Sequence, residues 1–521
     1  MTSEPASAEP ADLAARAAEK HVVVVGGGIG GLIAARECAK VGMRVTVLEA
    51  ADELGGAIRR VELDGVVIDA GAESYATRGG VVRALVDELG LTDRVVAPRP
   101  GGAWVAGVPG VGAAPLPVGG ILGIPANPFQ EDVRRILGWS GVWRAYLDRV
   151  RPPLTIGHQL SLGRLVASRM GDKVRDRLVA PVTTGVYSAS PDDVDTDVAA
   201  PGLNAALTRV GSLSGAVQAL RQDAASRTAG PAGAAKAPGA AVEGLAGGMI
   251  GLVDALAADV RGLGVEVRTG ARVRTVRRAD DTWTVDVELP VPDIAAGPAD
   301  PSADAVDAAD AVDAVDELEE LVADAVVVAT SESVARALLA GVVPALVSAD
   351  AVVSPEIEIV TLLLDAPELD AAPRGTGVLT VPGSHTAKAL THSTAKWAWV
   401  REAAGARHIV RVSFGSQGEP AATANLDDDA ATDLARSEAA TMLGVPLRPE
   451  SVVASHRGRF VQSQPASIIG SGERRAAARA AVQAVPGLAA VGAWLAGTGL
   501  AQVVPDAREE ADRLRRALLW E

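Results

Sequence analysis

The feature that most constrains the fold is a glycine-rich turn near the start of the chain. The segment Gly26-Gly27-Gly28-Ile29-Gly30-Gly31 follows the apolar run His21–Val25, which has the pattern of a buried strand, and it opens a helical pattern over Ile29–Val41. In such a turn the first glycine permits a tight bend, the second lets a pyrophosphate approach the backbone, and the third allows close helix–sheet packing. The helix N-terminus faces the anion. The arrangement predicts a dinucleotide site in an α/β fold.

The residues after the turn distinguish between the two common dinucleotides. A second strand is expected over Arg44–Leu48, and Glu49 follows it, about 20 residues beyond the glycines, where a carboxylate can accept hydrogen bonds from an adenosine ribose. Both NAD and FAD present that ribose. The pair Gly55-Gly56 after Glu49 is typical of flavoproteins in which the chain folds back over the pyrophosphate. We therefore expect FAD, rather than NAD, as the cofactor.

Length and composition exclude several other classes of protein. The 521 residues give room for two to four domains. Cys38 is the single cysteine, which excludes an intramolecular disulfide and a cysteine-based zinc site, and we expect no metal. One cysteine also fits a cytoplasmic protein. Cys38 itself is most simply a small core residue. The net charge of −16 argues against nucleic acid as a partner. The uncharged stretches Gly101–Gln130 and Ala480–Val504 are broken by Gly and Pro, so no transmembrane span is expected.

Periodicity predicts further elements and two irregular stretches. Helices are expected over Val81–Leu89, Val133–Val150, Leu162–Leu178 and from Asp506 onward, and strands over Trp283–Leu289, Ala325–Ala329, Ile357–Leu364 and Ile409–Phe414. Residues Ala224–Ala241 are rich in Ala, Gly and Pro, as in a flexible connection. Residues Val291–Asp324 carry eleven acidic side chains and no basic one, so we expect a solvated insert between two strands.

Beyond the glycine turn, six segments follow one another in an order and spacing found in one family. They are residues 71–91, residues 161–195, Gly244–Met249, Lys388–Trp397, Ala406–Phe414 and Gly492–Leu500. With the turn they cover nearly the whole chain outside the two irregular stretches. The sequence thus resembles the bacterial coproporphyrinogen III/protoporphyrinogen oxidase family, which is FAD-dependent and belongs to the flavin amine oxidase superfamily.

The resemblance implies an α/β architecture. It consists of a discontinuous, Rossmann-like FAD-binding domain of the GR2 type, a mixed-sheet substrate-binding domain and a helical module. We expect the FAD-binding domain at residues 21–100, 241–345 and 455–521, with the acidic insert 291–324 inside it. The helical module and a linker would occupy residues 101–240, and the substrate-binding domain residues 346–454. Residues 1–20 are expected to form a disordered tail.

The resemblance also implies the cofactor contacts. The glycine turn would hold the pyrophosphate. At the adenosine end, contacts would come from Glu49 and Ala50, and Val273 would meet the adenine from its strand. Ala57 would lie at the second glycine pair, and the segment beneath the flavin would be Gly71, Ala72, Glu73 and Ser74. The C-terminal segment would contribute Gly499, Leu500 and Ala501. Backbone N–H groups at the start of the C-terminal helix would favour the reduced, anionic flavin.

The reaction that the resemblance implies is the oxidation of coproporphyrinogen III to coproporphyrin III in haem biosynthesis. In each of three rounds a hydride passes from a meso methylene to the flavin N5, and O₂ closes the round by forming H₂O₂. The expected partners are the porphyrinogen and O₂, and a transient contact with ferrochelatase is compatible with this role. No strong base is required, because each oxidation acidifies a pyrrole N–H, and no catalytic residue is singled out.

Some substrate-binding residues can be suggested. A substrate with several carboxylates needs Arg or Lys side chains near its pocket, and Arg78, Lys396 and Arg411 are the candidates, although each also fits a solvated surface ion pair. Tyr187 fits either a pocket wall or a buried structural position. Phe460 stands where the family has Trp in a conserved pocket segment.

Other functions stay open from the sequence. Protoporphyrinogen IX is the alternative substrate, although no arginine lies beside Gly101-Gly102 to anchor its propionate as in plant and animal enzymes. An amine oxidase needs an aromatic cage, which three Tyr and three Phe make hard to assemble. The segment Phe460–Ser471 lacks the Gln, Tyr and His of the family, so an inactive flavin- or haem-binding partner protein is a further alternative.

Overall fold

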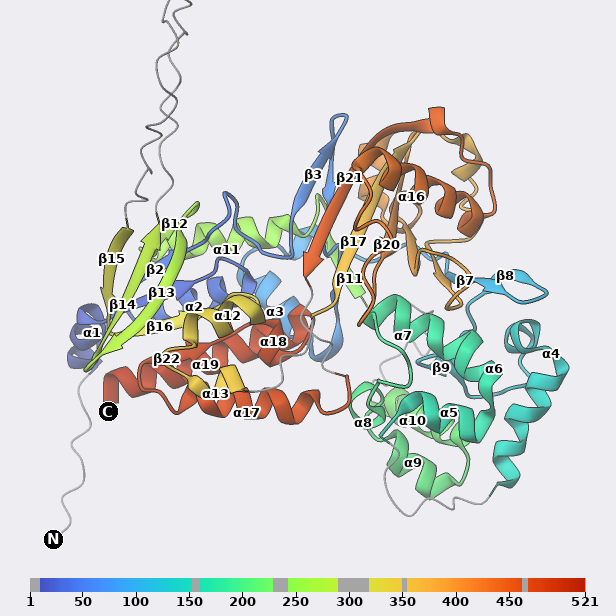
Figure 1. Cartoon of the computed structure of the whole chain (residues 1–521), viewed down its shortest axis with the longest axis horizontal. Helices are drawn as coiled ribbons and strands as arrows, with labels where there is room; N and C mark the ends of the chain where they lie inside the picture. The colour runs from blue at the N-terminus through green and yellow to red at the C-terminus, as the bar shows by residue number, and fades with distance from the viewer. Residues whose placement is uncertain are drawn as a thin grey trace, which may run out of the picture.

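A computed structural model describes residues 10–151, 160–227, 242–288, 318–348, 354–461 and 467–520. The chain forms two principal sheets and a helical module (Figure 1). The glycine-turn end carries a parallel sheet with its helices, and the helical module, which bears α4 (Glu131–Tyr146), lies at the opposite end of the molecule. The mixed sheet stands between and above them. The predicted α/β class is confirmed.

The parallel sheet is built around two valine-rich strands, His21–Val25 and Ala325–Val328, that are buried on both faces, as is usual in parallel sheets. Its order is β12-β2-β1-β16-β22, with every neighbouring pair parallel. The strands are β12 (Glu266–Arg268), β2 (Arg44–Leu48), β1 (His21–Val25), β16 (Ala325–Val328) and β22 (Leu488–Ala490). Strands from both ends and the middle of the chain therefore share one sheet, and the predicted strand–helix–strand unit at its centre is confirmed.

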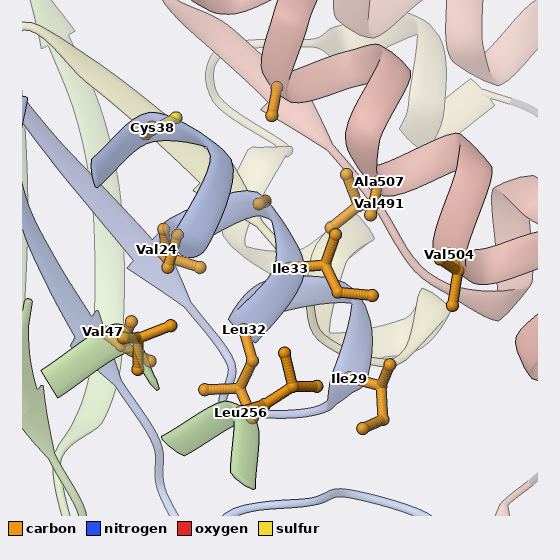
Figure 2. Close-up of a cluster of buried hydrophobic side chains, with 14 of the residues drawn as sticks. Val24, Ile29, Leu32, Ile33, Cys38, Val47, Leu256, Val491, Val504 and Ala507 are labelled. Atoms are coloured by element: carbon orange, nitrogen blue, oxygen red, sulfur yellow. The ribbon is translucent and has the colours of Figure 1, made fainter. Parts of the chain in front are cut away.

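Alternate residues of β1 enter two different cores. Val22 and Val24 pack with helices α2 (Ile29–Ala39), α11 (Ile250–Gly262) and α19 (Leu500–Trp520) on one face. Figure 2 shows this helical core, in which Leu32 and Ile33 of α2 meet residues of α11 and α19. Val23 and Val25 pack on the other face, with the antiparallel sheet β13 (Arg272–Ala279), β14 (Thr282–Glu288) and β15 (Leu318–Ala323). Side chains on successive strand residues point to opposite faces, which gives both contacts.

Three predictions about where helices, strands and irregular stretches begin or end are wrong. Residues Pro10–Glu19 form helix α1 rather than a disordered tail, because Ala17 is buried in the helical core and α1 lies against α19 and β2. The acidic insert ends earlier than expected, because β15 pairs with β14 from Leu318 onward. Helix α19 begins at Leu500, six residues before the expected start. Residues 228–241 of the predicted flexible connection and residues 291–317 of the predicted insert lie outside the described residues.

The second sheet has seven strands in the order β21-β17-β20-β19-β18-β7-β8. These are β21 (Val452–Val461), β17 (Glu356–Leu364), β20 (His408–Phe414), β19 (Ala389–His392), β18 (Gly377–Thr380), β7 (Ala103–Val108) and β8 (Gly112–Pro115). It is mixed, as expected, because β18 and β7 run parallel. The expected limits at residues 101 and 455 cut through it, since β7 and β8 join it before the helices begin and β21 extends to Val461.

The helical module packs around a buried charge. Its helices are α4, α5 (Leu162–Met170), α7 (Ala180–Tyr187), α9 (Leu203–Val210) and α10 (Leu213–Arg227). Asp148 is fully buried, accepts hydrogen bonds from the Leu213 N–H (2.6 Å) and pairs with Arg169 (2.5 Å). The single helix predicted over Leu162–Leu178 is interrupted, because Gly171 takes a φ of 94°.

Truncation of Leu256 tests the helical core between α2 and α11. This side chain is fully buried, so Leu256→Ala should lower the free energy of unfolding by about 2–5 kcal/mol through lost burial and a residual cavity. Urea unfolding followed by circular dichroism measures the change. Leu263→Ala is the matched control, because Leu263 caps the same helix but is 40% exposed, and its cost should stay within about 0.5 kcal/mol. Equal costs would contradict this view of the core.

Candidate active site

The glycine turn brings β1, α2 and β16 into unusually close approach. A Cβ on Gly31 would lie 2.0 Å from the Gly26 carbonyl oxygen, and a Cβ on Gly26, whose φ is 109°, would lie 2.7 Å from the Ala329 carbonyl oxygen. A Cβ on Gly28 would have nothing within 4 Å. Gly26 and Gly31 are thus required for packing, whereas Gly28 borders open space at the start of α2.

The second glycine pair folds back onto the first turn. The Gly55 N–H donates to the Gly27 carbonyl oxygen (3.0 Å), and Gly28 and Gly55 form a parallel bridge. Gly55 and Gly56 have φ values of 118° and 62°, which L side chains rarely adopt. The expected return of the chain over the pyrophosphate position agrees with this geometry.

The segment after Asp69 lies beside that return. A Cβ on Gly71 would lie 2.1 Å from the Ala57 carbonyl oxygen and 3.2 Å from the Phe460 ring, so Gly71 joins the second glycine pair to the end of β21. The Ala72 N–H also donates to the Ala57 carbonyl oxygen (3.4 Å). Ser74 is half-buried just before β5 (Tyr75–Ala76). Ala57, the 71–74 segment and Phe460 therefore come together from three parts of the chain.

At the other end of the turn, Glu49 organises the loop after β2. Its carboxylate accepts hydrogen bonds from the backbone N–H groups of Gly27 (2.7 Å) and Ala51 (2.9 Å). Ala50 is exposed beside it. The Glu49 carbonyl oxygen accepts from the Ala271 N–H (2.9 Å), which sets Val273 of β13 close to Glu49. These residues form one edge of the turn, as expected of an adenosine site.

The C-terminal segment lies against the start of α2. A Cβ on Gly30 would lie 3.4 Å from Val503 of α19 and 3.5 Å from Gly492. Gly499, with a φ of 112°, precedes the first turn of α19, where Leu500 and Ala501 are half-buried. The helix starts of α2 and α19 are thus neighbours, and residues at opposite ends of the chain border the same region.

These residues fit a bound dinucleotide. The first N–H groups of α2 have no partner within the helix, Gly28 leaves room for close approach, and the Glu49 carboxylate follows β2, where a ribose hydroxyl would be held in this kind of fold. When bound, FAD supplies the two-electron redox chemistry.

Two of the three candidate substrate cations are paired within the protein. Glu73 accepts from Lys396 (2.5 Å) and from Arg411 (3.1 Å), and its side chain is 13% exposed. Arg411 is also buried, and it donates to the carbonyl oxygens of Ala70 (2.8 Å) and Gly71 (2.5 Å). Burial would raise the pKa of Glu73, but the charges of Lys396 and Arg411 outweigh it and lower that pKa to about 2. This network of salt bridges and hydrogen bonds attaches residues 70–73 to the mixed sheet.

Asp69 sits at the N-terminus of α11, where its carboxylate accepts from the Met249 N–H (2.8 Å). Its second oxygen, Oδ2, is buried without a hydrogen-bond partner among the described residues. Burial raises the pKa of Asp69 to about 7, against the opposing charge of Arg411. This carboxyl group therefore titrates near neutral pH, directly before the 70–73 segment.

The third candidate cation, Arg78, is exposed. Burial raises the pKa of the Tyr187 phenol, and the nearby charge of Arg78 partly opposes that shift. Tyr187 ends α7, beside Ser188. Sequence reasoning missed Lys388, which reaches the same helix end: its Nζ donates to the Ser188 hydroxyl (2.5 Å). The one available signal was the scarcity of lysine, six residues among 49 basic ones.

The segment that departs from the family pattern joins the two halves of the molecule. Residues 462–466 lie outside the described residues. Directly after them, the Ser467 carbonyl oxygen accepts from the Asp195 N–H (2.5 Å), and the Ile469 N–H donates to Asp193 (2.9 Å). The chain leaving β21 is therefore attached to the helical module.

Residues 29–515 match the family model described as flavin containing amine oxidoreductase, and the chain belongs to that family. It is a flavin-containing oxidoreductase.

Among curated proteins, it is 28% identical to a coproporphyrinogen III oxidase of Propionibacterium freudenreichii, over 96% of this chain and 91% of the relative. It is 30% identical to the coproporphyrinogen III oxidase of Mycobacterium bovis, over 92% of this chain and 93% of the relative. A crystal structure assigned as a protoporphyrinogen oxidase from Exiguobacterium matches with a TM-score of 0.76 and 22% identity, over 95% of this chain and 99% of that one. The last likeness concerns the fold.

Substitution of Gly31 tests the close approach at the glycine turn. Gly31→Ala should lower the free energy of unfolding by about 1–3 kcal/mol and reduce the flavin bound per mole of purified protein, because the new Cβ displaces the Gly26 carbonyl. Flavin absorbance after denaturation measures the occupancy. In the control Gly262→Ala, the Cβ meets open space at the end of α11, so flavin content should be unchanged. Full flavin occupancy in Gly31→Ala would contradict the packing role.

Glu73 should give a defined pH dependence of stability. Because the folded-state pKa of Glu73 is depressed to about 2, its contribution is present above its ordinary pKa of 4.5 and is lost as the pH falls toward 2. Glu73→Gln should therefore cost about 3 kcal/mol at pH 7, and the difference from the wild type should shrink between pH 4.5 and pH 3. Urea unfolding at several pH values measures this. Glu62→Gln, at an exposed position on β3 (Arg60–Leu63), should show no such difference.

Proposed function

We propose that this protein oxidises coproporphyrinogen III to coproporphyrin III, with O₂ as the electron acceptor, in haem biosynthesis. The observation that carries the proposal is the likeness to coproporphyrinogen III oxidases over more than nine-tenths of the chain and of each relative. Such coverage includes the cofactor segments, the mixed sheet and the helical module together. Six electrons leave the substrate in three rounds, and each round reduces one O₂ to H₂O₂.

The protein's own residues bind and orient. The glycine turn and the N-terminus of α2 would hold the pyrophosphate, and Glu49 would accept from the ribose. Arg411 and Lys396, both paired with Glu73, would hold residues 70–73 beneath the flavin. The mixed sheet and α7 would cover the substrate and exclude water. No described residue is needed as a strong base, because oxidation itself acidifies the pyrrole N–H groups.

The distribution of aromatic side chains favours a porphyrinogen over an amine substrate. Phe129, Trp143 and Tyr146 form an edge-to-face cluster on and beside α4, at the far end of the helical module (Figure 1). From the mixed sheet, the aromatic ring that contacts Gly71 is that of Phe460. Among the described residues, Phe460 forms no pair with a second aromatic ring, whereas an amine-binding cage needs facing aromatic side chains.

The proposal extends to location and partners. We place the reaction in the cytoplasm, in keeping with a single, buried cysteine. In the part of the chain that the structure describes, no helix is both long and apolar enough to cross a bilayer. A transient contact with a ferrochelatase would pass the porphyrin to the next enzyme.

An aerobic assay tests the function. The flavin-loaded protein, incubated with coproporphyrinogen III, should produce porphyrin fluorescence and H₂O₂ well above autoxidation, at three H₂O₂ per porphyrin. Protoporphyrinogen IX should be oxidised with a lower kcat/KM. A rate no higher than autoxidation, despite bound flavin, would exclude the enzymatic function, and a higher kcat/KM for protoporphyrinogen would reverse the substrate assignment.

A further inference from the structure

Lys388 carries a half-buried amine whose hydrogen-bond partner is a neutral hydroxyl. Its Nζ donates to Ser188 Oγ, and the described residues contain no salt bridge to it. An ammonium has three N–H donors, and a buried one is stable only when paired with an anion. Lys396, eight residues on, has such an anion, because it is paired with Glu73. Among the described residues, Lys388 has no anionic partner.

The hydrogen bond to Ser188 brings the amine of Lys388 to the end of α7, which lies over the face of the mixed sheet that looks toward the cofactor segments. On the opposite face, Val410 and Val412 of β20 pack under α16 (Asp428–Leu443). Arg411 alternates with them and so points to the cofactor side, where it binds the 70–73 segment. Helix α7 covers this same face, because a Cβ on Gly185 would lie 2.5 Å from Leu379, the neighbour of Val378 on β18.

The serine that holds Lys388 has an unusual backbone. Ser188 is buried and takes a φ of 56° at the end of α7, a left-handed conformation that is uncommon for residues other than glycine. Strained positions of this kind cluster at functional sites. The C-terminal end of a helix also favours a nearby positive charge. The conformation turns the serine hydroxyl toward the sheet, where it receives the lysine N–H.

The charged and titratable groups on neighbouring elements leave this lysine electrostatically alone. Arg78 lies near enough to Tyr187 to affect the pKa of that phenol, His385 lies in the turn before Lys388, and Glu438 of α16 accepts a hydrogen bond from the Ala387 N–H (3.3 Å). None of these groups shifts the pKa of Lys388, which burial alone lowers to about 7. Among the described residues, no carboxylate is paired with Lys388 that an incoming anion would have to displace.

We propose that Lys388, oriented by Ser188, binds a carboxylate on the periphery of the substrate. The proposal rests on the proposed function, whose substrate carries four propionates. Lys388 lies in the bend three residues before Thr391, which is paired with Arg411, so the backbones of the two cations stand about 10 Å apart, and Ser188 draws the Lys388 amine to the α7 side. A carboxylate at Lys388 would thus belong to the rim of the macrocycle, away from the carbon that is oxidised. Arg78, exposed near Tyr187 at the end of α7, is the candidate for a second carboxylate.

Choice of a lysine fits this role. The chain uses arginine at 43 of its 49 basic positions, and a buried arginine would stay charged when no substrate is bound. A buried lysine can lose its proton and then regain it when a carboxylate arrives. Binding at Lys388 is therefore coupled to uptake of one proton near neutral pH.

Equilibrium binding of coproporphyrin III, the stable tetracarboxylate product, tests the proposal without relying on turnover. Lys388→Met should weaken binding to the flavin-loaded protein at pH 6 at least tenfold. Binding to the wild type should weaken as the pH rises through about 7, as the amine loses its proton. Lys388→Arg should bind at pH 6 and lose this pH dependence. The matched control is Lys173→Met, because Lys173 also donates to a serine hydroxyl, that of Ser140, but on the surface.

Flavin content and melting temperature show whether each variant is folded, and Lys388→Arg keeps the test informative if Lys388→Met is not. Equal affinity of Lys388→Met or of Lys388→Arg at every pH, compared with the wild type, would overturn the proposal, as would a loss confined to kcat. The outcome is separate from that of the oxidase assay. Lysine-dependent binding without oxidation would refute the proposed function alone, and oxidation with lysine-independent binding would refute the role of Lys388 alone.

Discussion

The structure depends on the close contact between the start of α2 and the ends of β1 and β16. Backbone atoms of Gly31 and Gly26 approach so closely that a methyl group at residue 31 has no room. This contact sets the direction of α2, and with it the point at which the helix N-terminus meets an anion. The second glycine pair, the 71–74 segment and the start of α19 are then arranged around that point. The cofactor site is therefore a consequence of backbone packing more than of any charged side chain.

Salt bridges, by contrast, attach the mixed sheet to the cofactor segments. Glu73 forms salt bridges to both Lys396 and Arg411, and the three side chains together attach a loop from the N-terminal part of the chain to residues more than 300 positions later. The cost of burying these charges is offset only because they are paired. Lys388, by contrast, donates to a serine hydroxyl and forms no salt bridge among the described residues.

Short-range sequence patterns were sufficient to predict the elements that depend on neighbouring residues. The strand, turn and helix around Gly26–Gly31 follow from glycine spacing and apolar periodicity. The other cofactor segments were predicted from the order and spacing that the family resemblance supplies. Long-range pairing could not be predicted. Nothing near Arg411 in the sequence reveals that it binds the carbonyl oxygens of Ala70 and Gly71, so it looked like a substrate anchor. Lys388 was overlooked because its burial comes from α7, two hundred residues earlier.

The neighbouring starts of α2 and α19 have a consequence for biosynthesis. Gly30 lies so near Val503 and Gly492 that an added Cβ would touch both, so residues separated by more than 450 positions border one region. A growing chain can form β1, the glycine turn and α2 early, yet its helical core stays open on the side that α19 later covers. That core is therefore complete only after α19 has been made.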